Sequence, residues 1–315
     1  MIALIKSSLI SSFLTVGSNF IAGGIQMSRL QVINGIPFPD VPWFKKKNIE
    51  ETMDYVPHDG DVIIASYPKT GTTWLQYIVL QITSRGESFP SFNDVLDKIA
   101  PFMEMTGTAV IDNLKGLRMY KHHYPYNRVK KNPKSKYLYI YRHPEDTIVS
   151  SHHFFSDVRQ EKIDFDEFFE DFLTGNIEYG SYLDNVLSYY NHKDDENMLL
   201  ISYEKLHANR KEGILRIAKF LGEEYYESLS SDESLLDKIV RHTSFDYMKK
   251  NLYLILPQNQ PKEGSEDTKN TVNFFRKGTV GDGKNVLSPD QIRRLRERIA
   301  EIMKGTEILE EWTRA

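Results

Sequence analysis

The sequence of 315 residues contains no cysteine and no Asn-x-Ser/Thr glycosylation acceptor. The missing thiols exclude disulfide bonds, a cysteine nucleophile and thiolate metal ligands. An excess of positive charge is also missing, because 40 Lys and Arg stand against 44 Asp and Glu. The charge of the whole molecule therefore gives no reason to expect nucleic acid or a membrane as a partner. We expect a cytoplasmic protein in which local basic clusters bind any anionic ligand.

The start of the chain is nearly free of charge. Lys6 is the only charged residue in positions 1–26, as in signal peptides and membrane anchors. However, five serines and three glycines interrupt this stretch, and no convincing small-x-small cleavage site follows. We predict that residues 1–26 are a flexible extension, or lie upstream of an alternative start at Met27. A targeting segment is the alternative interpretation.

Four short apolar runs indicate a regular alternation of strands and helices. The predicted strands are Asp61–Ser66, Leu117–Lys121, Tyr137–Tyr141 and Met198–Ser202. The predicted helices that follow three of them are Thr72–Ser84, Glu145–Phe155 and Lys211–Leu221. Strands that alternate with helices are typical of a parallel sheet. We therefore predict an α/β fold with a central parallel β-sheet, helices on both faces and, for residues 27–315, a single domain.

Two segments toward the C-terminus carry local signals. Ser288, Pro289 and Gln291 form the N-cap, the first-turn proline and the capping box of a predicted last helix. Before it, Leu252–Asn273 is polar and shows no periodicity, with prolines at 257 and 261. We predict a lid or binding loop there, with plain disorder as the alternative.

The strongest local signal is the stretch from Tyr67 to Trp74, between a predicted strand and a helix. Gly71 lets the backbone approach a ligand closely, the helix N-terminus offers N–H groups, and Lys69 adds a full charge. This pattern predicts an anion-binding loop. It is not a Walker A loop, because the lysine precedes the glycine. A chance Gly/Thr-rich turn is the alternative for the loop taken alone.

The loop resembles the 5′-phosphosulfate loop of the cytosolic sulfotransferase family. Four other motifs of that family recur in order, namely Tyr141–Ser150, Tyr203-Glu204 at the end of a strand, His242–Phe245, and Arg276–Gly278 followed by Gly281-Asp282. The resemblance spans residues 36–285 and implies a P-loop-like sulfotransferase domain. It also implies transfer of a sulfuryl group from 3′-phosphoadenosine 5′-phosphosulfate (PAPS) to the hydroxyl of a small apolar acceptor, such as a phenol or steroid, without a metal.

The same resemblance assigns residues to the nucleotide. Those for its 5′ end are Lys69, Thr70, Gly71, Thr72 and Thr73. Those for the 3′-phosphate are Arg142, Ser150, Arg276, Lys277 and Gly278. Those for adenine are Trp74 and Phe245 by stacking, and Tyr203 and Thr243 by hydrogen bonds. An arginine fork suits a phosphate well because its planar donors match two oxygens.

His123 stands at the position of the family's catalytic base, with His122 in place of a threonine. Adjacent strand residues point to opposite faces, so only one of the two should enter the site. The implied mechanism has His123 accept the proton of the acceptor hydroxyl while Lys69 and Lys121 stabilise the developing charge. The histidine pair is also compatible with a metal site, but no cysteine or helical His-x-x-x-His supports one.

The sequence departs from the family in two places. Gly283 replaces a tryptophan in the loop after Asp282, which predicts a more mobile loop. The family's dimer motif is degraded, since Ser288-Pro289 follows Lys284 and Arg293 replaces a glutamate. We therefore expect a monomer or a weak homodimer.

The acceptor is not determined by the sequence. The aromatic residues predicted to wall its pocket are Phe38, Phe102, Tyr124, Phe154 and Tyr253. The pair His152-His153 could line the same side or be structural. Three other functions stay open at this point: a P-loop-type nucleotide kinase, a non-catalytic nucleotide-binding relative, and a membrane-anchored Golgi-type sulfotransferase.

Overall fold

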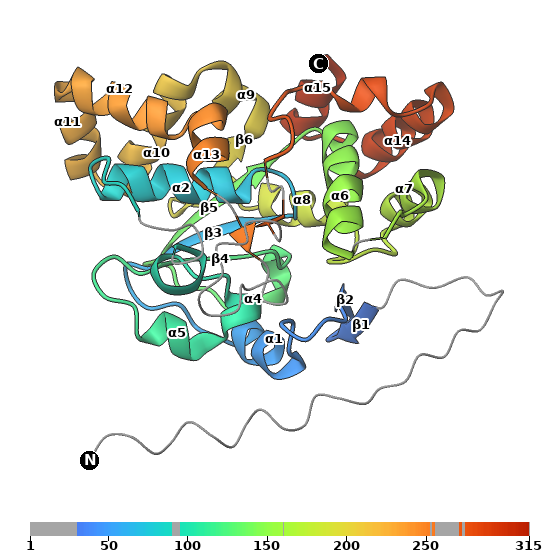
Figure 1. The fold of residues 1–315 in the computed structure, drawn as a ribbon, viewed down its shortest axis with the longest axis horizontal. Helices are drawn as coiled ribbons and strands as arrows, with labels where there is room; N and C mark the ends of the chain where they lie inside the picture. The colour runs from blue at the N-terminus through green and yellow to red at the C-terminus, as the bar shows by residue number, and fades with distance from the viewer. Residues whose placement is uncertain are drawn as a thin grey trace.

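A computed structural model describes residues 30–89, 95–159, 161–252, 254–255, 271–272 and 275–314 (Figure 1). The predictions for residues 1–26, for Tyr253 and for nearly all of the 252–273 loop lie outside these ranges. Within them, none of the helices is long and apolar enough to cross a bilayer.

Four parallel strands form the central sheet. They are β3 (Val62–Ser66), β4 (Met119–His122), β5 (Lys136–Tyr141) and β6 (Met198–Ser202), in the order β4-β3-β5-β6. The register pairs Ala65 with His122 and Ser66 with Ile140, so the carboxyl ends of the strands lie side by side. In open α/β sheets this edge is where ligands bind.

The strands bury both of their faces, as continuous apolar runs require. Along β3, Ile63 and Ala65 belong to one hydrophobic cluster, whereas Val62 and Ile64 belong to the other. The helices divide in the same way. Those packed in the cluster of Val62 and Ile64 are α2 (Thr72–Thr83), α9 (Tyr203–Ala208), α10 (Arg210–Leu221), α11 (Glu223–Ser231), α12 (Glu233–His242) and α13 (Phe245–Asn251).

The opposite cluster takes the remaining helices. They are α1 (Lys46–Met53), α4 (Met103–Thr106), α5 (Thr108–Asp112), α6 (Pro144–Arg159), α7 (Phe165–Thr174), α8 (Tyr182–Tyr190), α14 (Pro289–Ile302) and α15 (Glu307–Arg314). Figure 1 shows α2 on one side of the strands and α1 and α4 on the other. The predicted α/β fold with helices on both faces is therefore confirmed.

Short elements complete the described chain. They are the antiparallel hairpin β1 (Leu30–Ile33) and β2 (Ile36–Pro39), the pair β7 (Leu254–Ile255) and β8 (Thr271–Val272), a π-helix at Val95–Ile99, and 3₁₀ turns at Tyr126–Arg128 and Gly283–Asn285.

The predicted elements match to within a few residues, and the capping box at Ser288 and Gln291 is formed. One prediction is wrong, because Tyr203 and Glu204 do not end a strand. Strand β6 stops at Ser202, whose side-chain oxygen accepts a hydrogen bond from the backbone N–H of Lys205 and so caps α9. Tyr203 and Glu204 are therefore the first residues of α9.

Candidate active site

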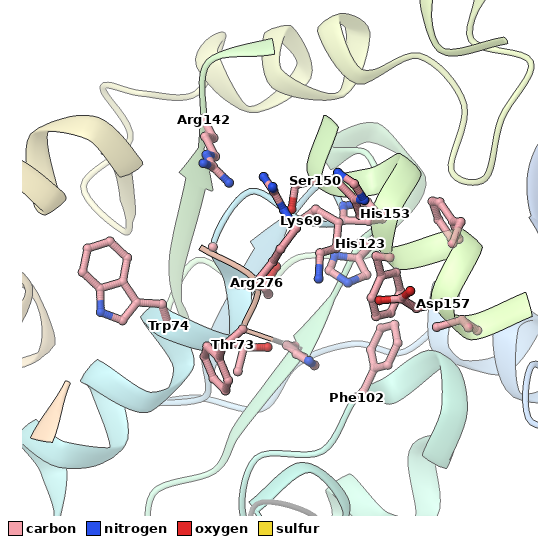
Figure 2. Close-up of a pocket in the computed structure, with 18 of the residues that line it drawn as sticks. Lys69, Thr73, Trp74, Phe102, His123, Arg142, Ser150, His153, Asp157 and Arg276 are labelled. Carbon is pink, nitrogen blue, oxygen red and sulfur yellow. The ribbon is translucent and has the colours of Figure 1, made fainter. Parts of the chain in front are cut away.

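A cavity of about 310 Å³ lies at the carboxyl ends of the strands. The loop after β3, the residues after β4 and β5, and Tyr203 after β6 all contribute to its lining. The segment Phe275–Gly278 lines it from the C-terminal part of the chain. Figure 2 shows Trp74 and Arg142 on one side of this cavity, and Phe102 and Asp157 on the other.

The loop between β3 and α2 is shaped by its own hydrogen bonds. The buried Thr70 hydroxyl contacts the carbonyl oxygens of Tyr67 at 2.8 Å and Ile140 at 3.1 Å, donating to them. Gly71 has a φ of 110°, and a β-carbon there would lie 2.8 Å from the Tyr203 ring. Glycine is thus required for both the left-handed turn and the close approach of the ring. Thr70 does not line the cavity, since its hydroxyl is used inside the loop.

The loop carries polar groups that suit an anion. Lys69 is half-buried, and its ammonium lies 4.0 Å from the centre of the Phe154 ring. Burial, and then the charges of Arg142 and Lys121, lower the pKa of Lys69 to about 7. The Thr73 hydroxyl is buried and finds no hydrogen-bond partner among the described residues. A phosphate at this helix N-terminus would neutralise the cluster of cations and accept a hydrogen bond from the unsatisfied donor.

Arg142 occupies a second cationic position, at the end of β5. Its guanidinium donates to Asp146 at 3.2 Å and to the Thr279 carbonyl at 2.8 Å, and lies 4.5 Å from the Tyr203 ring centre. Its Nε is buried without a partner among the described residues. Asp146 also accepts the N–H groups of Gly281 and Gly283 at 2.9 and 2.8 Å. One carboxylate therefore ties this arginine to the C-terminal loop.

In the C-terminal loop, Asp282 forms ion pairs with the basic residues of the same loop. Arg276 and Lys277 donate to the two Asp282 oxygens at 2.6 and 2.8 Å. These hydrogen bonds, that of Lys277 first, lower the pKa of Asp282. Both basic residues line the cavity, as does Gly278, where a β-carbon would lie 2.1 Å from the Phe245 ring.

Gly283 is buried rather than exposed in this loop. A β-carbon at this position would lie 2.3 Å from the backbone oxygen of Glu145 in α6. The sequence led us to expect a more mobile loop, but the structure gives this glycine a packing role, since it lets the loop lie against α6.

Aromatic rings surround the part of the cavity near α9. Trp74, Tyr203 and Phe245 all line it, and the indole N–H of Trp74 donates to the Thr243 carbonyl at 2.9 Å. Thr243 itself does not line the cavity, because its hydroxyl donates to the Ile239 carbonyl at 2.8 Å within α12. Ser150 on α6 lines the cavity as predicted from the sequence.

His123 follows the last residue of β4 and is fixed on several sides. Its Nδ1 lies 2.8 Å from the Ser66 carbonyl oxygen. A carbonyl only accepts, so Nδ1 carries the proton and Nε2 is left as the nitrogen that can accept one. The ring stands edge-on to Phe102 and Tyr179, with centroids at 5.0 and 5.3 Å. Burial, and then Lys121, hold the pKa of His123 well below its usual value, so the imidazole is neutral.

The two residues before His123 differ in whether they line the cavity. Lys121 lines the cavity beside His123, and burial lowers its pKa to about 8. His122 does not line it, and its Nδ1 accepts the backbone N–H of Tyr124 at 3.2 Å. Only one histidine of the pair enters the cavity, as the alternation along a strand predicts.

The other end of the cavity is mostly apolar. The side chains that form it include Val41, Trp43, Phe44, Phe102, Met105, Phe154, Phe155 and Tyr179. The polar side chains there are Thr106, His153, Asp157, Arg159 and Glu178. His152 points elsewhere and donates to the Ile163 carbonyl at 2.8 Å.

Two predicted wall residues do not reach the cavity. Phe38 and Tyr124 are fully buried and pack edge-on against each other, with ring centroids 5.9 Å apart. Phe38 also contacts Tyr179 from behind, and the Tyr124 hydroxyl bonds to Thr52. They form the core beneath the wall, and the wall itself is completed by Tyr179, to which no sequence pattern pointed.

Comparison with known proteins decides the family. Residues 59–307 match the family described as the sulfotransferase domain, which is well over half of the chain. The chain belongs to this sulfotransferase family. The sulfotransferase is 32% identical to mouse sulfotransferase 1B1, over 88% of this chain and 93% of the relative. It is also 32% identical to a guinea-pig 3-alpha-hydroxysteroid sulfotransferase, over 86% and 93%.

A solved structure supports the same assignment. Mouse sulfotransferase SULT7A1 was crystallised in a complex with PAP, which is 3′-phosphoadenosine 5′-phosphate, or PAPS without its sulfuryl group. It superposes with a TM-score of 0.72 at 28% identity. The likeness covers 90% of this chain and 99% of the mouse chain.

Three residues of this sulfotransferase that the sequence analysis missed also belong to the site. His207 and Arg210 line the cavity near Trp74, and the Arg210 guanidinium lies 5.8 Å from the Trp74 ring centre. His207 follows Tyr203 by four residues in α9, a helical spacing that was a usable signal, whereas Arg210 begins the next helix, α10. Glu104 does not line the cavity but accepts the backbone N–H of His123 at 2.7 Å, and no local pattern pointed to it.

Proposed function

We propose that this sulfotransferase transfers a sulfuryl group from PAPS to the hydroxyl of a small, mostly apolar acceptor. The observation that carries the proposal is one cavity with two unlike ends. The end near Trp74 combines cations with aromatic rings, and the end near Phe102 is apolar. His123 and Lys121 also line this cavity.

The cationic end fits a nucleotide with two anionic groups. Lys69 and the N-terminus of α2 would hold the 5′ end, while Arg142, Ser150 and the Arg276–Gly278 segment would hold the 3′-phosphate. The unsatisfied Thr73 hydroxyl and Arg142 Nε support this fit, since both are buried donors. So do Gly71 and Gly278, which let the backbone lie against the Tyr203 and Phe245 rings that line the cavity. The mouse relative complexed with PAP binds a nucleotide of the same kind.

When bound, PAPS supplies the sulfuryl group and a good leaving group. The residues of the chain supply the proton transfer and the charge stabilisation. In this proposal Nε2 of His123 takes the proton of the acceptor hydroxyl, because Nδ1 is committed to Ser66 and the ring is held neutral. Lys69 and Lys121 stabilise the negative charge that develops at the reacting oxygens. The enclosing aromatic rings keep water away from these groups.

The apolar end supports an acceptor with a hydrophobic body. Its walls come from aromatic and aliphatic side chains, as in most small-molecule sites. One relative is named for 3-alpha-hydroxysteroids, which are apolar alcohols. We infer a hydroxyl acceptor of this general class for the present chain.

The first test is isothermal titration of the purified chain with PAP in the absence of magnesium. We expect tight binding that Arg142→Ala weakens by about 10- to 100-fold, the loss typical of a hydrogen bond to a charged group. Arg142→Lys is the matched control and should lose less, because one donor remains. A panel of phenols, steroids and aliphatic alcohols with PAPS should then identify an acceptor.

Two results would count against this function. Failure of a folded protein to bind PAP would refute the nucleotide site. Dependence on magnesium, together with phosphate transfer from ATP, would instead support the nucleotide-kinase interpretation.

A further inference from the structure

The segment Pro101–Glu104 runs alongside the end of β4. The backbone N–H of Lys121 donates to the Pro101 carbonyl at 3.0 Å, and Phe102 pairs with Lys121 in a parallel bridge. This short segment therefore extends the sheet at the edge where His123 stands. A residue of this segment can contact the backbone of the proposed catalytic residues directly.

The parallel pattern breaks one step later. In a parallel ladder the next N–H, that of His123, would meet the carbonyl of Met103. Helix α4 begins at Met103, and the Met103 carbonyl instead accepts the N–H of Gly107 at 2.9 Å. The carboxyl group of Glu104 takes its place, since Oε1 accepts the His123 N–H at 2.7 Å. A side chain thus completes a ladder that the backbone leaves unfinished.

A carboxyl group at this buried position is energetically unfavourable. Glu104 is fully buried, and its Oε2 finds no hydrogen-bond partner among the described residues. Burial raises the pKa of Glu104 to about 8. A buried, half-satisfied carboxyl costs free energy that a neutral residue would avoid. Because Glu104 lies beside the proposed catalytic residues His123 and Lys121, we expect its charge to have a function there.

The charges near Glu104 indicate that role. Lys121 has its pKa lowered to about 8 by burial, and Glu104 is the group that opposes this shift. His123 faces the positive charges of Lys121 and Lys69. The tyrosines on which Glu104 acts electrostatically are Tyr124, Tyr179 and Tyr189, and burial raises the pKa of each further above 10. Glu104 is therefore the acid that supports the charge of Lys121.

We propose that Glu104 is a positioning residue of the transfer reaction, whose carboxyl group fixes the backbone of His123 and acts on Lys121, the strand neighbour of Phe102. This inference rests on the proposed roles of His123 and Lys121. The two parts of the role are separable by substitution. Glutamine keeps an acceptor oxygen for the His123 N–H but removes the charge, whereas leucine removes both.

The kinetic test compares Glu104→Gln and Glu104→Leu with wild type, using PAPS and the acceptor found by the panel. Glu104→Gln should lower kcat far less than Glu104→Leu near the pH optimum, and its alkaline limb should move to lower pH, because Lys121 loses its proton more easily without the carboxylate. Glu104→Leu should lower kcat on the order of 100-fold at every pH, since a small displacement of a catalytic group has that effect. PAP affinity should stay at the wild-type value in both.

A second measurement does not depend on turnover. In ¹⁵N-labelled wild-type protein, the His123 amide proton should titrate with Glu104, whereas in Glu104→Gln this titration should be absent. Asp61→Asn is the matched control, because Asp61 is a buried carboxylate at the other end of β3 that bonds to Arg118. It should lower the melting temperature without moving the alkaline limb or the His123 signal.

The outcomes separate the two proposals. Wild-type protein that neither binds PAP nor sulfates any acceptor refutes the proposed function. An active enzyme that needs His123, yet has an unmoved alkaline limb in Glu104→Gln or a wild-type kcat in Glu104→Leu, overturns the role of Glu104 alone. If Glu104→Leu does not fold, Glu104→Gln and the amide titration decide the question.

Discussion

The two ends of the cavity are built in different ways. The end near Trp74 takes its cations from short motifs, at residues 69–74, 142–150 and 275–278, and Arg142 and Arg276 are paired with Asp146 and Asp282. The end near Phe102 also draws on several separate segments, but its aromatic and aliphatic side chains lie in a hydrophobic core cluster and are held by packing.

This difference indicates how the chain specifies the binding of an anion and the binding of an apolar acceptor. An anion is bound by residue types at fixed local spacings, such as a lysine and a glycine at the start of a helix. An apolar acceptor is bound by a surface whose shape depends on how distant segments pack. Substitutions at the two ends should therefore have separable effects, and those at their junction should have the largest.

The largest effect is expected at the junction, for His123→Ala. Removing the proposed base should lower kcat by about 10²- to 10⁴-fold, the usual contribution of general-base catalysis. The affinity for PAP should remain, because the nucleotide contacts stay in place. Steady-state kinetics and isothermal titration give the two values.

His122→Ala is the control for that experiment, since His122 is equally buried but does not line the cavity. It should lower stability and leave turnover largely intact. Equal loss of turnover in both variants would mean that His123 has a structural role.

An intermediate effect is expected at the cationic end, from the pH dependence of PAP binding. The pKa of Lys69 is lowered to about 7 by burial and by the neighbouring cations, so most of it is neutral above that pH. A bound phosphate favours the protonated form, so binding above pH 7 should take up a proton. The affinity should rise as pH falls toward about 7, by up to roughly tenfold per pH unit, and should level off below it.

Titrations in two buffers of different ionisation enthalpy would measure this proton uptake. Lys69→Met should bind more weakly and lose the uptake. Lys277→Met, at an exposed lysine of the same end, should bind more weakly and retain it. Binding by wild type with no proton exchanged would show that Lys69 is already charged in the free protein.

The smallest effect is expected at the apolar end, where Phe154→Leu and Phe38→Leu form a pair. Phe154 lines the cavity, so its variant should raise the acceptor KM by several-fold, a typical cost of trimming a hydrophobic pocket. Phe38 lies beneath the wall, so its variant should lower the free energy of unfolding by about 1 kcal/mol and leave KM unchanged. Thermal unfolding and acceptor kinetics test both, and the reverse pattern would place Phe38 on the wall.

The sequence predicted most of the fold because buried strands have an unmistakable composition. Runs such as Tyr137–Tyr141 and Met198–Ser202 are too short and too apolar for anything but strands of a covered sheet. The strand Met198–Ser202 was predicted with the bounds of β6, but Tyr203 was assigned to the end of that strand and is instead the first residue of α9, which the Ser202 side chain caps.

For the site, the resemblance to the family was enough to find most of the cavity lining between Lys69 and Trp74, and that at His123 and Arg142. It was not enough to say which way a side chain points. Thr70 and Thr243 are in the right segments, but their hydroxyls bond to nearby carbonyls. A local motif fixes where the backbone goes, whereas the partner of each hydroxyl is fixed by the surrounding packing.

The sequence alone specified the parallel α/β sheet, the anion-binding loop and the entry of only one histidine of the pair into the cavity, because these depend on periodicity and on neighbours in the chain. The choice of His123 followed from the resemblance to the family. Only the tertiary structure decided that Tyr179, and neither Phe38 nor Tyr124, completes the acceptor wall, that Gly283 packs against α6, and that Glu104 supports His123. Those contacts join segments far apart in the chain, so their geometry exists only once the sheet and its helices have packed.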